Sequence, residues 1–344
     1  MTRPASDFGG FRLWPGLLDR AAQEALRQGI GTAVAPLGTA LTEEQLDLLW
    51  RAGPEPILCF DGDSAGKKAA YRAIDTMLPH LKPAEAVFHM GANSSTTSTD
   101  GDEILRVNLH ATMAWWQWCT HHGTPFIYAS SAATYGDGAQ GFDDDQSPEA
   151  LDKLAPLNLY GWSKHQFDKW AVERAAEGKA PPQWAGLKFF NVYGPNEYHK
   201  GDMKSLVAKN TALVERGETI RLFKSHKDGY EDGGQLRDFV YVKDCCSVMM
   251  WLLDHRHTSG LFNLGTGQTR SFVDLVQAIG KALNKPVTIE YVDMPESIRP
   301  NYQYFTEARM DKLGKAGYEQ GFHTLEEGVA DYVTQYLSKP DPYR

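Results

Sequence analysis

The sequence of 344 residues has no long uncharged apolar stretch, few cysteines and no excess of positive charge. No transmembrane helix is therefore expected, and residues 1–16 lack the apolar core typical of a signal peptide. The formal net charge of −9 argues against a general nucleic-acid-binding surface. The four cysteines, Cys59, Cys119, Cys245 and Cys246, lack metal-site spacing and fit small buried residues in a reducing compartment. These absences predict a cytoplasmic protein.

Apolar runs and helical patterns alternate through most of the chain. Hydrophobic residues make up 42% and charged residues 23%, as in soluble globular proteins of one or two domains. This alternation predicts an α/β fold with a parallel sheet. The predicted strands are 86–89, 125–129, 187–191, 220–223, 239–242 and 287–292. The predicted helices include 100–122, 203–217, 244–255 and 271–284, with Ser271 as an N-cap.

The spacing of Tyr160 and Lys164 indicates a proton-transfer site. Residues four apart lie on one face of a helix. A phenol with a pKa of about 10 is a poor base, and a nearby ammonium group lowers that pKa. Ser130 and Ser131 follow the predicted strand 125–129, at the sheet edge where open α/β folds place ligand chemistry. Together these residues suit proton transfer to a secondary alcohol during hydride transfer. A solvated tyrosine beside a lysine is the alternative.

Seven segments resemble the extended short-chain dehydrogenase/reductase family, and they are residues 88–97, 128–136, 158–164, 189–195, 199–203, 237–242 and 262–267. Segments 88–97 and 199–203, with Tyr302, are similar to the heptose 6-epimerases within it, which act on ADP-heptose for lipopolysaccharide synthesis and form homo-oligomers. The resemblance extends from about residue 85 to the C-terminus. It implies a Rossmann-like parallel sheet with helices on both faces, followed by a smaller α/β substrate-binding part.

The resemblance also implies residue roles. NADP, or NAD, would take hydride from C6 of the heptose and return it to the other face of the ketone. Tyr160 and Lys200 would be the acid/base groups on opposite faces, with Lys164 holding the nicotinamide ribose and Ser131 bonding the reacting oxygen. A solvated loop lysine is the alternative for Lys200. Cofactor positions match Met90, Gly91, Ala92, Asn93, Ser94, Asn108, Lys164 and Val192. Substrate positions match Asn191, Lys200, Asp202, Lys209, Phe223, Arg237 and Tyr302, with Arg237 as a diphosphate clamp.

Residues 29–83 resemble a different family, the Toprim domain of the bacterial replicative primase. Segments 34–42 and 55–66 carry this resemblance, and Asp61 and Asp63 match a magnesium-binding pair. The earlier Glu-Gly-Tyr motif of that family is missing. Asp61 and Asp63 are therefore interpreted as turn residues, and no metal is predicted. The domain boundary is expected near residue 84, with a Toprim-like fragment over 1–84 and an epimerase-like region over 85–344.

The sequence contains no Gly-x-x-Gly-x-x-Gly, the motif that brings backbone close to a dinucleotide pyrophosphate. The N-terminal Rossmann half is therefore interpreted as replaced by the Toprim-like segment, and strands near residues 34 and 57 could complete the sheet beside 86–88. Three interpretations stay open. They are a heptose-epimerase-type enzyme, an inactive hybrid without a dinucleotide site, and a magnesium-binding primase fragment acting on nucleic acid, which the acidic balance disfavours.

Overall fold

The computed structural model describes residues 85–296, 298–299 and 302–341. The chain divides into two units, Met1–Pro83 and Ala84–Arg344, and the described residues belong to the second. The Toprim-like segments, Asp61, Asp63 and the suggested strand pairing with residues 86–88 lie outside the described residues. Within the described part, no helix is both long and apolar enough to cross a bilayer.

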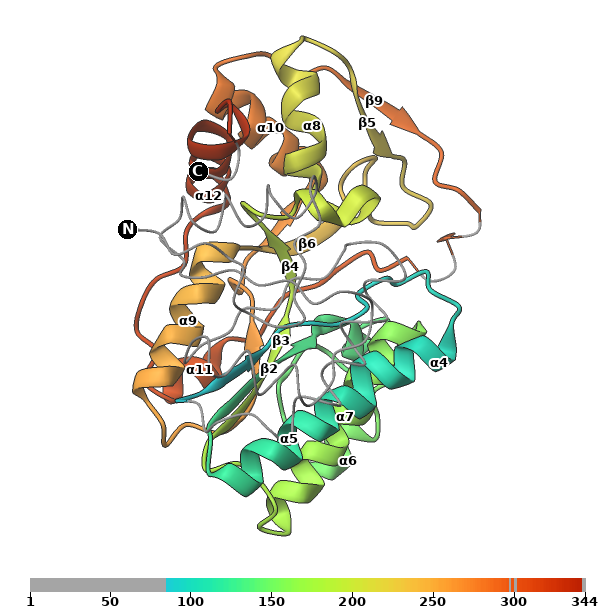
Figure 1. Cartoon of the computed structure of the whole chain (residues 1–344). Helices are drawn as coiled ribbons and strands as arrows, with labels where there is room; N and C mark the ends of the chain where they lie inside the picture. The colour runs from blue at the N-terminus through green and yellow to red at the C-terminus, as the bar shows by residue number, and fades with distance from the viewer. Residues whose placement is uncertain (1–84, 297, 300–301, 342–344) are drawn as a thin grey trace, which may run out of the picture. The chain divides into compact units, whose positions relative to one another are not determined.

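The central feature is a four-stranded, all-parallel sheet (Figure 1). Its order is β1 (Val87–His89), β2 (Phe126–Ser131), β3 (Trp184–Phe189) and β7 (Gly260–Leu264). The last three strands are buried along nearly their whole length, as expected for a parallel sheet covered on both faces. The predicted parallel α/β sheet is confirmed for this part of the chain.

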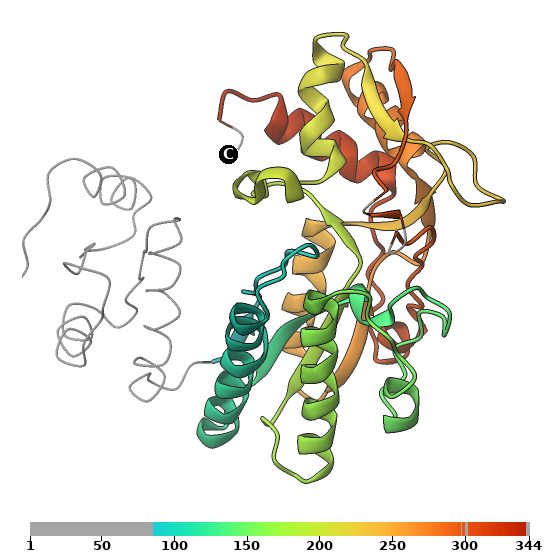
Figure 2. The same ribbon diagram turned by 90° about the vertical axis from the view of Figure 1, so that its right-hand side faces the viewer.

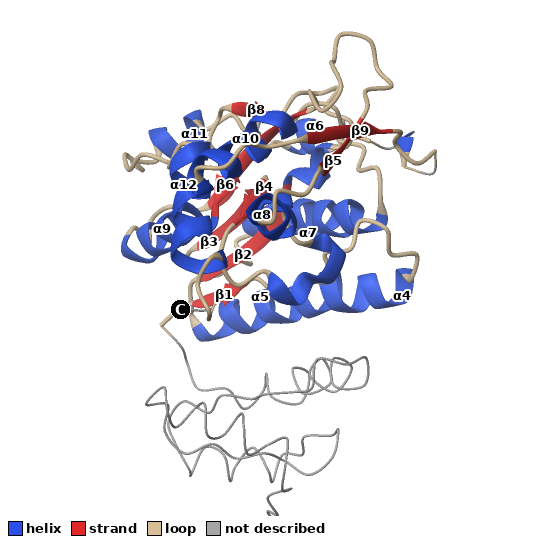
Figure 3. Cartoon of the chain, turned by 90° about the horizontal axis from the view of Figure 1, so that it is seen from above, coloured by secondary structure: helices blue, strands red, loops and turns tan. Residues whose placement is uncertain are grey.

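Helices cover both faces of this sheet (Figures 2 and 3). Trp116 and Phe167 pack edge-on against aromatic rings of β2 on one face. On the other face, Val248 and Leu252 share a core with Ile127 and Leu187. The first layer contains α4 (Gly101–Ile104), the π-helical η2 (Leu105–His110), α5 (Ala111–His122) and α7 (Leu159–Ala176), and the second contains α9 (Val242–Asp254) and α11 (Asp311–Lys315). The helix predicted over 100–122 is thus interrupted by a π-helical segment.

A smaller α/β part follows, as the sequence predicts. Its strands are β4 (Asn191–Tyr193), β6 (Leu236–Tyr241) and β8 (Thr269–Ser271) in one sheet, and β5 (Ile220–Phe223) and β9 (Ile289–Val292) in another. Its helices are α8 (Leu206–Glu215), α10 (Phe272–Leu283) and α12 (Leu325–Tyr332), followed by the π-helical η6 (Val333–Leu337). Their apolar faces meet around Val207, Val276 and Val329. Ser271 caps α10 as predicted, in a reciprocal capping box with Asp274.

The chain crosses between the two parts after Phe189. The strand predicted over 187–191 ends there, and Asn191 begins β4 in the second sheet, so the predicted strand end is wrong by two residues. The crossing is fixed by the backbone, because the N–H of Phe190 donates to the carbonyl of Leu264 in β7 at 3.1 Å. Three short segments complete the description, namely η3 (Ala132–Tyr135), α6 (Pro148–Leu151) and η4 (Tyr198–Met203).

Candidate active site

Ser131, Tyr160 and Lys164 come together at the carboxyl end of β2. Ser131 ends the strand, and Tyr160 lies in the first turn of α7 and shares a side-chain hydrogen bond with it. Lys164 lies one turn later, and its buried Nζ donates to the carbonyl of Ala129 at 2.6 Å. The close approach depends on Gly161, where a Cβ would lie 2.6 Å from the Ala133 carbonyl oxygen. The structure thus places the three predicted residues next to one another.

The phenol of Tyr160 is less acidic than the sequence predicts. Burial raises its pKa, the Ser131 hydrogen bond opposes this, and the Asp168 carboxylate adds to the rise. Lys164 is not among the causes of this shift, and its ammonium group is hydrogen-bonded to the Ala129 carbonyl. The expectation that Lys164 pulls the Tyr160 pKa down stays a prediction, and it requires the ammonium charge to act against the effect of burial.

Lys164 itself titrates near neutrality. Burial lowers the pKa of its ammonium group to about 8, and the Asp168 carboxylate opposes that effect. His89, at the end of β1, is held neutral because burial and the Lys164 charge lower its pKa to about 3. A lysine has three N–H donors, and one of these is used by Ala129. The other two are available for a polyhydroxylated ligand.

An asparagine joins the loop after β1 to α7. Asn108 lies in the π-helical η2, and such segments are frequent at functional sites. Its Nδ2 donates to the Asn93 carbonyl at 2.9 Å and to Ser163 Oγ at 3.0 Å, while its Oδ1 accepts the Asn93 N–H at 2.8 Å. Ser163 donates in turn to the carbonyl of Tyr160 at 2.7 Å. The loop from Met90 to Ser94 is thereby fixed to the helix that carries Tyr160.

The residues present fit the nicotinamide–ribose half of a dinucleotide. Lys164 offers free donors beside the phenol of Tyr160, and Asn108 fixes the loop that borders them. Val192 and Met90 pack against the same apolar core beneath this edge. For the pyrophosphate half, the described residues contain no Gly-x-x-Gly-x-x-Gly turn, since the sequence has none.

Arg237 lies buried among aromatic rings. Its guanidinium lies 5.2 Å from the Tyr302 ring centre and 5.6 Å from that of Phe272. It donates to the main-chain carbonyls of Leu236 and Gln303, and no carboxylate in the described part of the chain pairs with it. Burial lowers its pKa. A desolvated guanidinium without a counterion is suited to an anionic ligand.

A pocket of about 230 Å³ lies within the smaller α/β part, lined by β4, β6, α10 and the chain from Met203 to Leu206. Phe272, which stacks under Arg237, lines it together with Asn191 and Val192 of β4. Phe223 lies edge-on to Tyr302, with ring centres 6.4 Å apart. Among the predicted substrate residues, Tyr302 therefore contacts both Phe223 and Arg237. Phe272 connects Arg237 to the pocket that Asn191 lines.

Lys200, the fourth predicted catalytic residue, lies apart from the group formed by Ser131, Tyr160 and Lys164. It lies exposed in the 3₁₀ segment η4, where the sequence predicts a loop, and its N–H donates to the Glu197 carbonyl at 3.0 Å. Met203 of the same segment lines the pocket. Lys209 is exposed on α8. The side chain of Asp202 lies outside the described residues.

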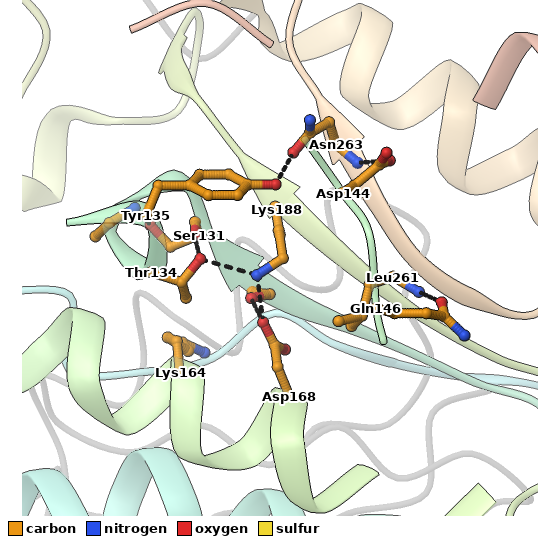
Figure 4. A network of polar contacts seen from close by, with 12 residues as sticks. Ser131, Thr134, Tyr135, Asp144, Gln146, Lys164, Asp168, Lys188, Leu261 and Asn263 are labelled. Atoms are coloured by element: carbon orange, nitrogen blue, oxygen red, sulfur yellow. Dashed lines mark hydrogen bonds and ion pairs between the residues drawn. The ribbon is translucent and has the colours of Figure 1, made fainter. Parts of the chain in front are cut away.

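A buried ion pair was missed by sequence reasoning (Figure 4). Asp168 follows Lys164 by one helical turn, and its Oδ2 lies 2.7 Å from Lys188 Nζ of β3. Both side chains are almost completely buried, with 0% and 1% exposure. A lysine between Leu187 and Phe189 in an apolar strand was the available signal, because a buried charge needs a partner.

No cluster of metal-ligating side chains occurs in the described part of the chain. Cys119 and Cys245 are buried free thiols, as predicted, whereas Cys246 is exposed. Burial raises the pKa of Cys119 to about 12, which keeps this thiol unreactive.

Comparison with known proteins identifies the family of this arrangement. Residues 65–265 match the NAD dependent epimerase/dehydratase family, which is more than half of the chain. The chain belongs to the NAD dependent epimerase/dehydratase family. A second match, to the Toprim domain, covers residues 21–85. The chain is therefore a sugar-nucleotide epimerase that uses a nicotinamide cofactor.

Similar proteins include enzymes that carry one specific name. The ADP-L-glycero-D-manno-heptose-6-epimerase of Fusobacterium nucleatum is 50% identical over 265 residues, covering 75% of this chain and 79% of that protein. The crystal structure of the Helicobacter pylori enzyme of the same name is 26% identical, with a TM-score of 0.60 and 75% of each chain covered. MoeE5 in complex with UDP-glucuronic acid and NAD is 26% identical with a TM-score of 0.62, covering 76% of this chain and 82% of that one.

Proposed function

We propose that this epimerase interconverts ADP-D-glycero- and ADP-L-glycero-D-manno-heptose at C6, using bound NADP or NAD. The observation that carries the proposal is the Ser131–Tyr160–Lys164 group at the end of β2, in a chain 50% identical to a heptose epimerase. The product would supply inner-core heptose for lipopolysaccharide. Of the two dinucleotides, NADP is the proposed cofactor. A cytoplasmic homo-oligomer is proposed from the same resemblance.

The chain's own residues perform the proton transfers. The nicotinamide, when bound, accepts hydride from C6 and returns it. Tyr160 takes the proton of the C6 hydroxyl as the C6–H bond breaks, and the substrate carbon is oxidised to a ketone. Ser131 donates a hydrogen bond to the same oxygen. Lys164 directs its free N–H donors to the ribose and supplies a positive charge that stabilises the phenolate.

Inversion requires access to both faces of the C6 ketone. We propose that Lys200 serves the second face and that Tyr160 serves the first. The exposed position of Lys200 leaves its side chain free to turn toward a ligand, and Met203 of the same segment borders the pocket. After the ketone turns over, return of hydride to its other face and of a proton to its oxygen completes the reaction.

The diphosphate of the substrate is assigned to Arg237. Its buried guanidinium has no carboxylate partner among the described residues, so an anionic ligand would satisfy the charge. Tyr302 and Asn191 would border the sugar, beside the pocket at β4. Phe223, Asp202 and Lys209 complete the proposed substrate side, and Asp202 belongs to η4 and Lys209 to α8.

A second candidate is an inactive hybrid that binds no dinucleotide. The absence of Gly-x-x-Gly-x-x-Gly from the sequence favours it. The two candidates differ in a direct assay with ADP-D-glycero-D-manno-heptose in deuterated water, followed by NMR. The epimerase interconverts the two heptoses without placing solvent deuterium at C6, because the hydride is returned from the cofactor. The hybrid gives no interconversion, even with added NADP or NAD.

A further inference from the structure

We propose that Asp168 and Lys188 are positioning residues for the proton-transfer group formed by Ser131, Tyr160 and Lys164. The inference rests on the proposed function for its catalytic meaning, although the geometry it describes is independent of the substrate. Neither residue touches the place where a substrate would react. Their effect is transmitted through β2 and through the turn that follows it.

Asp168 fastens α7 to the strand that carries the catalytic serine. Its Oδ2 accepts the hydroxyl proton of Ser130 at 2.7 Å, directly before Ser131, and its Oδ1 accepts that of Tyr128 at 3.0 Å. Lys164, one turn earlier on the same helix face, donates to the carbonyl of Ala129. Three consecutive positions of β2 are therefore bound to α7 by side chains four residues apart.

Lys188 fixes the position of Ser131 through Thr134, in the turn that follows β2. Its Nζ donates to Thr134 Oγ1 at 2.8 Å, and Thr134 donates to the carbonyl of Ser131 at 2.8 Å (Figure 4). The ammonium also lies 5.0 Å from the ring centre of Tyr135. Because β2 and β3 pair with Ser130 opposite Lys188, the sheet register itself places this ammonium beside Asp168.

A buried ion pair is seldom retained for stability alone. Desolvation offsets much of the attraction between the charges, and apolar replacements of similar volume are often neutral. Here the other hydrogen bonds of the pair lead to Tyr128 and Ser130 of β2 and to Thr134 in the turn that follows β2. Polar networks of this kind specify a single geometry, and a displacement of about 1 Å at reacting groups can lower turnover by about 100-fold.

The carboxylate also acts on Lys164 through charge. In the described part of the chain, the Lys164 ammonium interacts through charge with the Asp168 carboxylate on α7 and with His89 on β1, and His89 is neutral. Asp168 is the one that favours the protonated ammonium. Its removal leaves burial unopposed, so Lys164 loses its proton at lower pH. A purely structural pair would leave the pH dependence of turnover unchanged.

The test compares the double variant Asp168→Asn/Lys188→Met with a matched control. The control, Asp152→Asn/Lys169→Met, removes an ion pair at the surface between Lys169, which follows Asp168 on α7, and Asp152, which follows α6. We expect the first variant to stay folded and its turnover of ADP-heptose to fall by about 100-fold. The alkaline limb of its pH profile should move to lower pH, and amide exchange over residues 131–135 should accelerate. The control should behave as wild type.

A second variant protects the test against misfolding. Thr134→Val leaves the ion pair in place and removes only the two hydrogen bonds of Thr134 Oγ1, the one it accepts from Lys188 and the one it donates to the Ser131 carbonyl. It should accelerate amide exchange over 131–135 and lower turnover. Wild-type exchange and turnover in Thr134→Val, or in the folded double variant, would overturn the proposal. If wild type does not turn over ADP-heptose, the proposed function fails, and the exchange data still decide the positioning role.

Discussion

The guanidinium of Arg237 and the ring of Tyr302 form a cation–π pair, 5.2 Å from charge to ring centre, in the smaller α/β part. Arg237 is supplied by β6, whereas Tyr302 lies 65 positions later in the loop after β9. Their meeting makes a charged, desolvated surface beside a pocket of about 230 Å³. Arg237 and Tyr302 are therefore expected to act together on the substrate.

Replacement of Arg237 by Lys should weaken substrate binding more than it slows chemistry. The lysine keeps the charge but loses the planar fork and ring stacking. Loss of charged hydrogen bonds worth about 1.5–3 kcal/mol predicts a KM for ADP-heptose raised about 10- to 100-fold. Steady-state kinetics would measure it, with Arg216→Lys as the control because Arg216 is a surface residue paired with Glu218. An unchanged KM would remove Arg237 from the diphosphate site.

Replacement of Tyr160 by Phe should abolish most turnover without unfolding the protein. General acid–base groups contribute about 10²- to 10⁴-fold, so kcat should fall by that range. Stability should change little, because within the described residues the phenol loses one hydrogen bond, the one it shares with Ser131. Tyr318→Phe is a matched control, since its phenol also bonds one serine, Ser247, at 3.1 Å. Near-normal kcat in Tyr160→Phe would exclude the phenol as the acid/base.

Activity should decline as pH rises through about 8, where the Lys164 ammonium loses its proton. The pH dependence of kcat/KM reports this group in the free enzyme. The effect on stability has the opposite sign. The pKa is lowered from 10.5 on folding, so the unfolded chain binds more protons between about pH 8 and 10.5, and the free energy of unfolding rises across that range.

Lys164→Met separates these two effects. It removes the charge, so the rise in the free energy of unfolding above pH 8 should disappear, and turnover should be low at every pH. Chemical denaturation at a series of pH values measures the first and steady-state assays the second. A stability profile identical to that of wild type would show that Lys164 is not buried as described.

Glu197→Ala should destabilise the protein and disturb the segment that carries Lys200. The buried carboxylate accepts the N–H and hydroxyl of Ser205 at 2.7 and 2.5 Å and the hydroxyl of Tyr332 at 3.1 Å. Loss of partners for buried donors costs about 1–3 kcal/mol each, so urea unfolding should show a loss of several kcal/mol. Glu173→Ala, exposed on α7, is the control. Equal stabilities for the two variants would contradict this role of Glu197.

The sequence predicts local chemistry well because that chemistry is encoded by short spacings. Tyr160 and Lys164 are four residues apart on one helix, and Ser131 follows an apolar strand, so their grouping follows from helix and sheet periodicity. The N-cap at Ser271 follows for the same reason. These predictions need no knowledge of tertiary packing.

The features that the sequence does not predict depend on packing. Lys188 is 20 positions from Asp168, and only the register of β2 and β3 brings them together. The direction of the Tyr160 pKa follows from burial, which a helix pattern does not reveal. Asn191 starts a new strand because it pairs with Phe239 of β6, a partner far away in the sequence.

The central claim is that this chain serves a nicotinamide cofactor although its sequence has no Gly-x-x-Gly-x-x-Gly. The most direct measurement is the absorbance and mass spectrum of ligand released from the purified, denatured full chain. The account predicts NADP or NAD, close to one per chain, and the same result for Tyr160→Phe. The absence of both dinucleotides, together with no binding of added NADP or NAD, would contradict it.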